Sequence, residues 1–259
     1  MMPSIFLCHG APYLAIQDTD YTQSLNQLGK TLGKPKAILL FSAHYESREQ
    51  LLTSTDGEYE TIYDFSGFPR ELYEIRYPAK GSTDMASKIQ TLLADAGIPS
   101  AADTVRGLDH GVWVLLRHLY PDADVPVIAA SINRQLSPQE QYALGKAVSR
   151  LKQEDVLIIA SGGTSHNLRM IEWDATKPAE WTVKFDDWLL EKISAWDQEA
   201  LFDYRNQAPY ADWAVPPYGN EHFVPLFIAM GAGDDVKKAT VLQRSYELGT
   251  LSLIGLQFG

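Results

Sequence analysis

Five of the six histidines in this 259-residue chain lie in short segments rich in Gly, Ser or Pro, not on apolar helix faces. They are His9, His44, His110, His166 and His222. Imidazole is a common metal ligand and the side chain that titrates nearest neutral pH, so these residues together would form a metal site or an acid–base site. Each of them alone is more simply explained as a hydrogen-bonded loop residue, but five such segments favour a shared site.

Three protein ligands with open coordination positions are the arrangement that mononuclear metal catalysis needs. Two histidines and one carboxylate with open positions suit Fe(II) and oxygen activation. The chain contains neither an HExxH nor a CxxC motif, and its histidines are far apart in the sequence. Spacing alone therefore predicts a metal-dependent enzyme without selecting the metal or the reaction.

Carboxylates adjacent to the histidines are candidates for orienting them. Glu46 is close enough to His44 in the sequence to hold its imidazole, as groups behind metal ligands commonly do. Asp109 is expected to tune the protonation of His110. The remaining histidine, His118, continues the helical pattern after His110 without a flanking Gly, and we interpret it as a surface or structural residue.

Apolar runs predict the strands that position these segments. The runs at 4–8, 37–41, 125–130 and 156–160 do not alternate, which is typical of strands covered on both faces. His9 and His44 follow the first two runs, and His166 follows the fourth after a loop that contains Gly162 and Gly163. Loops at the carboxyl ends of strands gather in one crevice of an open α/β sheet. The backbone N–H groups of the Gly-Gly segment could hold a small polar group there.

Between the runs, helices are predicted at 21–32, 82–96, 111–119, from 137 onward, at 181–196 and at 223–230. A partly exposed strand is expected at 50–55, and a terminal strand pair at 240–246 and 251–257 turns at Gly249. This alternation predicts a single-domain α/β sandwich over residues 1–259, with a mixed central sheet and helices on both faces.

Composition restricts the partners. A net charge of −11 argues against a nucleic-acid partner, because such affinity rests on Lys and Arg neutralising phosphates. No apolar stretch approaches the roughly 20 residues of a membrane span. The N-terminus lacks the pattern of a signal peptide, and a single cysteine fits a reducing compartment. We therefore expect a cytoplasmic protein with a small-molecule substrate and no membrane partner, and the oligomeric state stays open.

Several motifs in these same segments carry a family resemblance. They are His9-Gly10-Ala11-Pro12, Ser42-Ala43-His44, Tyr63-Asp64-Phe65-Ser66-Gly67-Phe68-Pro69, Leu108-Asp109-His110-Gly111, Ser161-Gly162-Gly163 with His166-Asn167-Leu168, and Glu221-His222-Phe223. In this order they resemble the class III extradiol ring-cleaving dioxygenases of the LigB type, especially the branch similar to 4,5-DOPA extradiol dioxygenase. The resemblance spans nearly the whole chain and implies a catalytic domain that opens a catechol-type ring with O2 at a non-haem Fe(II).

The resemblance also implies a role for each residue of the site. His9, His44 and His222 look like the metal ligands, with Glu221 as an alternative third ligand. His166 looks like the acid–base residue, or a fourth ligand when Zn(II) occupies the site of a purified protein. His110 looks like a second histidine that contacts substrate or oxygen. Tyr63, Phe65, Gly162 and Gly163 are then the expected substrate-binding residues.

Two other functions use the same histidines. A zinc-dependent hydrolase would activate water for attack on an amide or ester. A non-catalytic metal-binding protein of the same fold is the second alternative, although a complete set of five site histidines weighs against it.

Overall fold

Eight strands form one mixed sheet in the computed structural model, which describes residues 1–259. The strands are β1 (Ser4–Cys8), β2 (Ala37–Glu46), β3 (Gln50–Thr53), β4 (Ser100–Asp103), β5 (Val127–Ile132), β6 (Val156–Gly162), β7 (Ala239–Glu247) and β8 (Leu251–Phe258). Their order across the sheet is β4-β3-β5-β2-β6-β1-β8-β7. The four central strands β5, β2, β6 and β1 are parallel, while β3 and β8 run antiparallel to β5 and β1.

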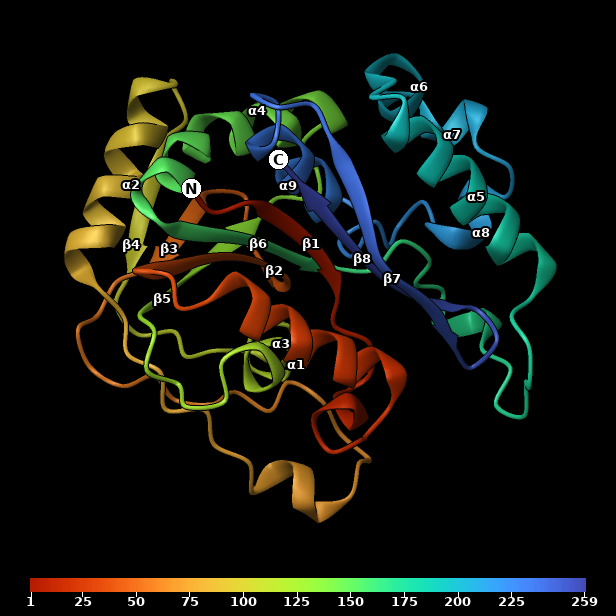
Figure 1. Ribbon diagram of the computed structural model, residues 1–259, viewed down its shortest axis with the longest axis horizontal. Coiled ribbons are helices and arrows are strands. Elements are labelled where there is room, and N and C mark those ends of the chain that lie inside the picture. The colour runs from red at the N-terminus through yellow and green to blue at the C-terminus, as the bar shows by residue number, and fades with distance from the viewer.

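Helices cover both faces of this sheet. They are α1 (Asp20–Leu32), α2 (Thr83–Asp95), α3 (His110–Leu119), α4 (Pro138–Val148), α5 (Glu180–Ser194), α6 (Gln198–Phe202), α7 (Tyr204–Gln207), α8 (Ala211–Ala214) and α9 (Pro225–Ala232). Helices α1 and α3 lie on one side of the sheet, and α2, α4 and α9 lie on the other (Figure 1). The predicted α/β sandwich with a mixed central sheet is thereby confirmed.

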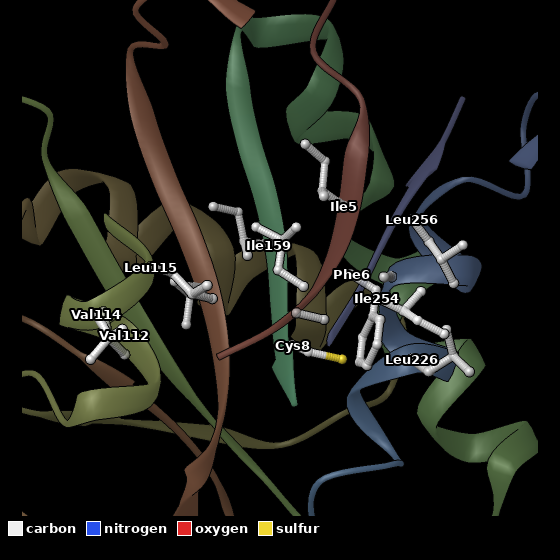
Figure 2. Packing of buried hydrophobic residues seen from close by; sticks show 14 of the residues in the cluster. Ile5, Phe6, Cys8, Val112, Val114, Leu115, Ile159, Leu226, Ile254 and Leu256 are labelled. Carbon is white, nitrogen blue, oxygen red and sulfur yellow. The ribbon is translucent and has the colours of Figure 1, made fainter. Parts of the chain in front are cut away.

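The unbroken apolar runs supply both layers of the core. Along β2, Ile38 and Leu40 join the larger hydrophobic cluster, whereas Leu39 and Phe41 join the smaller one on the opposite face. Successive side chains of a strand point to opposite faces, so a run without polar positions fits a strand buried on both sides. Figure 2 shows the larger cluster, where residues of β1, β6 and β8 pack together.

Helix starts follow the expected capping chemistry. The Ser82 hydroxyl accepts a hydrogen bond from the N–H of Met85 at the start of α2. Ser137 and Glu140 form a reciprocal capping box at the start of α4, with Pro138 in the first turn. These caps satisfy backbone N–H groups that have no partner within the helix.

Some element boundaries differ from the predicted ones. Strand β2 continues through His44 to Glu46, with a register shift against β5 after Phe41. The small residues at 42–43 hid this continuation, because they end the apolar run while remaining buried. Strand β4 was missed because its sequence, Ser-Ala-Ala-Asp, has no β-branched or aromatic residue. The short helices α6 to α8 were also missed, and α9 begins at Pro225 instead of residue 223.

The parallel strands β1, β2 and β6 end at the same edge of the sheet. Residues 9, 44 and 162–166 lie at this edge, so the fold brings together segments that are distant in the sequence. No helix in the structure is long and apolar enough to cross a membrane.

Candidate metal centre

The structure brings all five predicted histidines together. His9 follows β1, His44 lies on the extension of β2, His110 is the first residue of α3, His166 follows β6, and His222 lies in the turn before α9. The ligand atoms of His9, His44 and His110 all lie within 4.8 Å of one another, and so do those of His166, Glu221 and His222. Contacts between His44 and His222 join the two groups into one cluster.

Three imidazoles direct the same nitrogen toward a common point. His44 Nε2 lies 3.0 Å from His9 Nε2 and 3.2 Å from His222 Nε2. Ligand nitrogens about 2.0–2.1 Å from a shared ion are separated by roughly 3.0–3.4 Å, so this spacing fits a metal. His110 belongs to the same group by distance, but no Nε2–Nε2 contact joins it to the other three.

The partner of His9 fixes the proton on its ring. The Ser161 hydroxyl donates to the carbonyl of Gly111 at 2.6 Å and lies 2.8 Å from His9 Nδ1. Because that hydroxyl proton is already committed, the Ser161 oxygen accepts from the Nδ1–H of His9. The Nε2 of His9 therefore carries a lone pair directed into the cluster.

Asp64 binds two of the histidines. Its Oδ2 lies 3.2 Å from His44 Nδ1, and its Oδ1 lies 2.9 Å from His110 Nδ1. The same Oδ1 accepts the backbone N–H of His110 at 3.0 Å, at the start of α3. Both imidazoles thus place Nδ1 next to one carboxylate.

Of the two carboxylates expected to act on these histidines, Glu46 acts elsewhere, whereas the charge of Asp109 acts on His110 as expected, because it raises the pKa of that imidazole against the larger effect of burial. Glu46 pairs with Arg134 at 3.0 Å, so its predicted contact with His44 is wrong. Residues 44 and 46 would share a face of a regular strand, but β2 has a register shift between Phe41 and Glu46 that interrupts this alternation. Asp109 is buried and accepts hydrogen bonds from Ser42 and Arg106. Its direct hydrogen bonds thus go to those two residues, and Asp64 is the carboxylate bonded to His110.

Glu221 lies behind His222. Its Oε1 is 3.1 Å from His222 Nδ1, while His222 Nε2 faces His44. Glu221 Oε2 has no hydrogen-bond partner and lies 3.5 Å from Arg134 Nη1, close enough for electrostatic attraction.

The Nε2 atoms of His9, His44 and His222 therefore each direct an unprotonated lone pair into the cluster. These lone pairs repel one another unless a cation lies among them. This donor set fits a bound divalent metal, with each Nδ1–H held from behind.

Burial disfavours the charged form of His9, His110 and His222. The pKa values of His9 and His222 lie well below the usual value, first because burial disfavours the charged form and second because neighbouring histidines repel it. Burial likewise lowers the pKa of His110, although the hydrogen bond to Asp64 opposes the shift. For Asp64, burial alone would raise the pKa, but hydrogen bonds from His110 and His44 outweigh it and lower the pKa.

His166 stands beside the cluster. Its ring stacks on that of His222, with centroids 3.5 Å apart and planes at 9°. Burial lowers its pKa to about 4, with repulsion from His44 as the next cause. The imidazole is therefore neutral at pH 7 and able to accept a proton.

Aromatic side chains from residues 63–73 line one side of the cluster. The ring of Phe65 meets that of His110 edge-on at 5.8 Å, and it also packs against Phe68 and Tyr73. The hydroxyl of Tyr63 donates to the carbonyl of Ile75 at 2.6 Å, which places this hydroxyl away from the histidines. Phe65 is thus the aromatic residue of this segment in contact with a cluster histidine.

The two glycines before His166 differ in their surroundings. A Cβ on Gly162 would lie 2.1 Å from the carbonyl oxygen of His222, whereas a Cβ on Gly163 would make only ordinary contacts. The N–H of Gly163 donates to that same carbonyl at 2.8 Å. The sequence had suggested that backbone N–H groups in this segment hold a small polar group. The N–H of Gly163 instead holds the backbone of His222.

His118 lies outside the site, as predicted, whereas Asp64 is a site residue that was not predicted. His118 Nε2 contacts the carbonyl of Leu14 at 2.7 Å, remote from the cluster, so its structural interpretation is confirmed. Asp64 was quoted within a motif but not recognised as a site residue. Asp64 follows no strand and lies far from its partners in the sequence. The one feature of the sequence that could have identified it is the presence of a carboxylate within an aromatic segment.

Comparisons with known proteins agree on one family. Residues 3–256 match the family model described as the catalytic LigB subunit of aromatic ring-opening dioxygenase. A 4,5-DOPA dioxygenase extradiol from Beta vulgaris is 38% identical, covering 98% of this chain and 96% of the relative. A protein of the same name from Escherichia coli K12 is 34% identical, covering 100% of this chain and 95% of its own. The crystal structure of an uncharacterized protein from Escherichia coli K12 superposes with a TM-score of 0.83 at 31% identity, over 100% of both chains.

Proposed function

Because this chain belongs to the LigB family of extradiol aromatic ring-opening dioxygenases, we propose that it is a non-haem Fe(II) enzyme that opens a catechol of the DOPA type with O2. The observation that carries this proposal is the convergence of three Nε2 atoms at separations of 3.0 and 3.2 Å. The names of the relatives support the substrate class, and the three converging nitrogens support the metal.

In this proposal His9, His44 and His222 hold the metal. Glu221 is the less suitable third ligand, because its carboxylate already faces the Nδ1 side of His222. When bound, Fe(II) would make a catechol hydroxyl more acidic and would let electron density pass from the catechol to O2. The same nitrogens suit Zn(II), which we expect to find in purified protein and which has no redox chemistry of its own.

His166 is the proposed acid–base residue. Its pKa of about 4 leaves the ring unprotonated at pH 7, ready to remove a proton from a hydroxyl of the bound catechol. His110 is the proposed second histidine at the substrate. Its Nδ1–H is held by Asp64, so its Nε2 is left to accept a hydrogen bond from a hydroxyl of the substrate.

The proposed substrate wall consists of Phe65, supported by Tyr63, and the two glycines. Phe65 stands beside His110, where its ring can pack against that of a catechol. Tyr63 packs edge-on against Phe65 at 6.2 Å and holds it from behind. Gly162 and Gly163 contribute mainly by leaving space next to His166 and His222.

Anaerobic reconstitution with Fe(II), followed by O2 addition and a panel of catechols that includes DOPA, tests the proposal. We expect O2 uptake in step with loss of the catechol and formation of a ring-opened semialdehyde with a new absorbance band. Zn(II) at equal occupancy should give neither. Hydrolysis of an ester or amide with zinc, without O2 uptake, would instead favour the zinc hydrolase, and metal binding without either reaction would favour a non-catalytic protein.

A further inference from the structure

Asp64 connects two histidines that come from different elements. One carboxylate oxygen lies 3.2 Å from Nδ1 of His44 on β2, and the other accepts from Nδ1 of His110 on α3 at 2.9 Å. The two imidazoles lie with their ring centroids 3.9 Å apart. The side chain of Asp64 is 24% exposed, so it stands at the rim of the cluster and not in a dry core.

We propose that Asp64 is a positioning residue that fixes the Nδ1 protons of both His44 and His110, so that both Nε2 lone pairs face the metal centre. The inference rests on the proposed metal site but not on the reaction performed there. A neutral imidazole has one N–H and one acceptor nitrogen, so an acceptor at Nδ1 decides which nitrogen can bind a metal. An acceptor shared by two rings therefore determines which nitrogen carries the proton in both of them.

A third contact determines how an amide at this position would sit. The Oδ1 of Asp64 also accepts the backbone N–H of His110 at 3.0 Å, and a backbone N–H cannot become an acceptor. In Asp64→Asn the amide oxygen must therefore remain on the side of His110. The amide NH2 then faces His44 Nδ1 and donates to it, which moves the His44 proton to Nε2 and removes its lone pair from the metal.

This geometry predicts an unusual order of effects for two substitutions. Asp64→Ala removes both acceptors but imposes no wrong donor, and water can reach the vacated rim. We therefore expect Zn2+ affinity to decrease in the order wild type, Asp64→Ala, Asp64→Asn, with a loss of about 10–100-fold for Asp64→Asn. A role limited to capping α3 predicts the opposite order, because Asn retains an acceptor for the His110 N–H and Ala does not.

The experiment measures Zn2+ affinity by competition with a chelator for wild type and both variants. Asp56→Asn is the matched control, since Asp56 accepts the Thr83 N–H at 2.8 Å at the start of α2 and touches no histidine. This control should bind Zn2+ as the wild type does. Equal affinities for all four proteins, or a weaker Asp64→Ala than Asp64→Asn, would overturn the proposal.

Nitrogen-15 NMR of the histidine rings tests the same idea without any variant. In the wild type, the signals of His44 and His110 should each show the proton on Nδ1. A proton on Nε2 of either ring contradicts the proposal even if the variants fail to fold. Failure of wild-type protein to bind Zn2+ would contradict the metal centre itself, while binding without Fe(II)-dependent ring opening would contradict only the proposed reaction.

Discussion

His166 lies parallel to His222, with the two ring centroids 3.5 Å apart. The lone pair of an imidazole nitrogen lies in the plane of its ring. A metal held by His222 in its ring plane would therefore lie outside the plane of His166, as expected of a base beside the metal. The stacking favours a base that reaches bound substrate over a fourth ligand.

Replacing His166 by Asn should separate binding from chemistry. Metal content and catechol binding are expected to stay near the wild-type level, while turnover falls about 10²–10⁴-fold because the proton acceptor is lost. Metal per chain and O2 uptake measure the two effects. An empty site in this variant would make His166 a ligand, and normal turnover would remove it from the mechanism.

Replacing His44 by Ala should remove the metal without unfolding the chain. His44 contacts both other proposed ligands, whereas the core of β2 consists of residues 37–41, which stay unchanged. Metal analysis of the purified variant should find almost none, with a circular dichroism spectrum like that of the wild type. His118→Ala is the control, because that ring contacts the carbonyl of Leu14 instead, and it should retain full metal content.

Gly162→Ala should disturb the metal centre although it changes no ligand. The new Cβ would meet the backbone oxygen of His222 at 2.1 Å, so the turn that carries this histidine must move. We expect weaker metal binding and a free energy of unfolding lower by about 1–3 kcal/mol. Gly163→Ala is the neighbouring control, since its Cβ would find contacts of 3.6 Å or more. Similar behaviour of the two variants would contradict this explanation.

Phe65→Leu should weaken substrate binding more than chemistry. An aromatic contact is worth about 0.5–1.5 kcal/mol beyond its buried area, so KM for a catechol should rise about 2–10-fold with kcat little changed. Leu keeps an apolar side chain against His110 and so limits structural damage. Steady-state kinetics under Fe(II) provide the measurement, and an unchanged KM would remove Phe65 from the substrate wall.

The metal-free protein should lose stability as the pH falls from 7.5 to 6. Burial lowers the pKa values of four cluster histidines, at positions 9, 110, 166 and 222, whereas in the unfolded chain they titrate near 6.5. Unfolding then takes up protons, and acidification to pH 6 lowers the free energy of unfolding by roughly 1 kcal/mol for each of His9, His166 and His222, with His110 acting in the same direction.

Asp186 limits this test to pH 6 and above. Burial raises its pKa to about 6, so below that value the folded state takes up a proton that an unfolded Asp, with a pKa near 4, does not. This uptake stabilises the fold and opposes the histidines. Urea unfolding at pH 7.5 and 6 in the presence of a chelator gives the measurement. His166→Asn should show a smaller pH dependence, and an equal dependence would argue against a buried neutral ring.

The sequence predicted the central strands and the histidine cluster for the same physical reason. Runs of Ile, Leu and Val without polar interruption are typical of strands that are covered on both faces of a sheet. Histidines that follow such strands lie at the carboxyl edge of the sheet. The partners of those histidines were harder to find. Ser161 and Asp64 act through contacts across 152 and 46 residues of sequence, with His9 and His110, and no local pattern reports such contacts. Glu46 was chosen for its sequence proximity to His44, but it lies beyond a register shift in β2 and pairs with Arg134.

The position of β1 between β6 and β8 has a consequence for the synthesis of this protein. A nascent chain that ends before residue 156 has neither neighbour for β1, and one that ends before residue 222 lacks a proposed ligand. The metal centre cannot form on the early part of the chain while the rest is still being translated. Capture of a metal by the three proposed ligands therefore follows long-range folding.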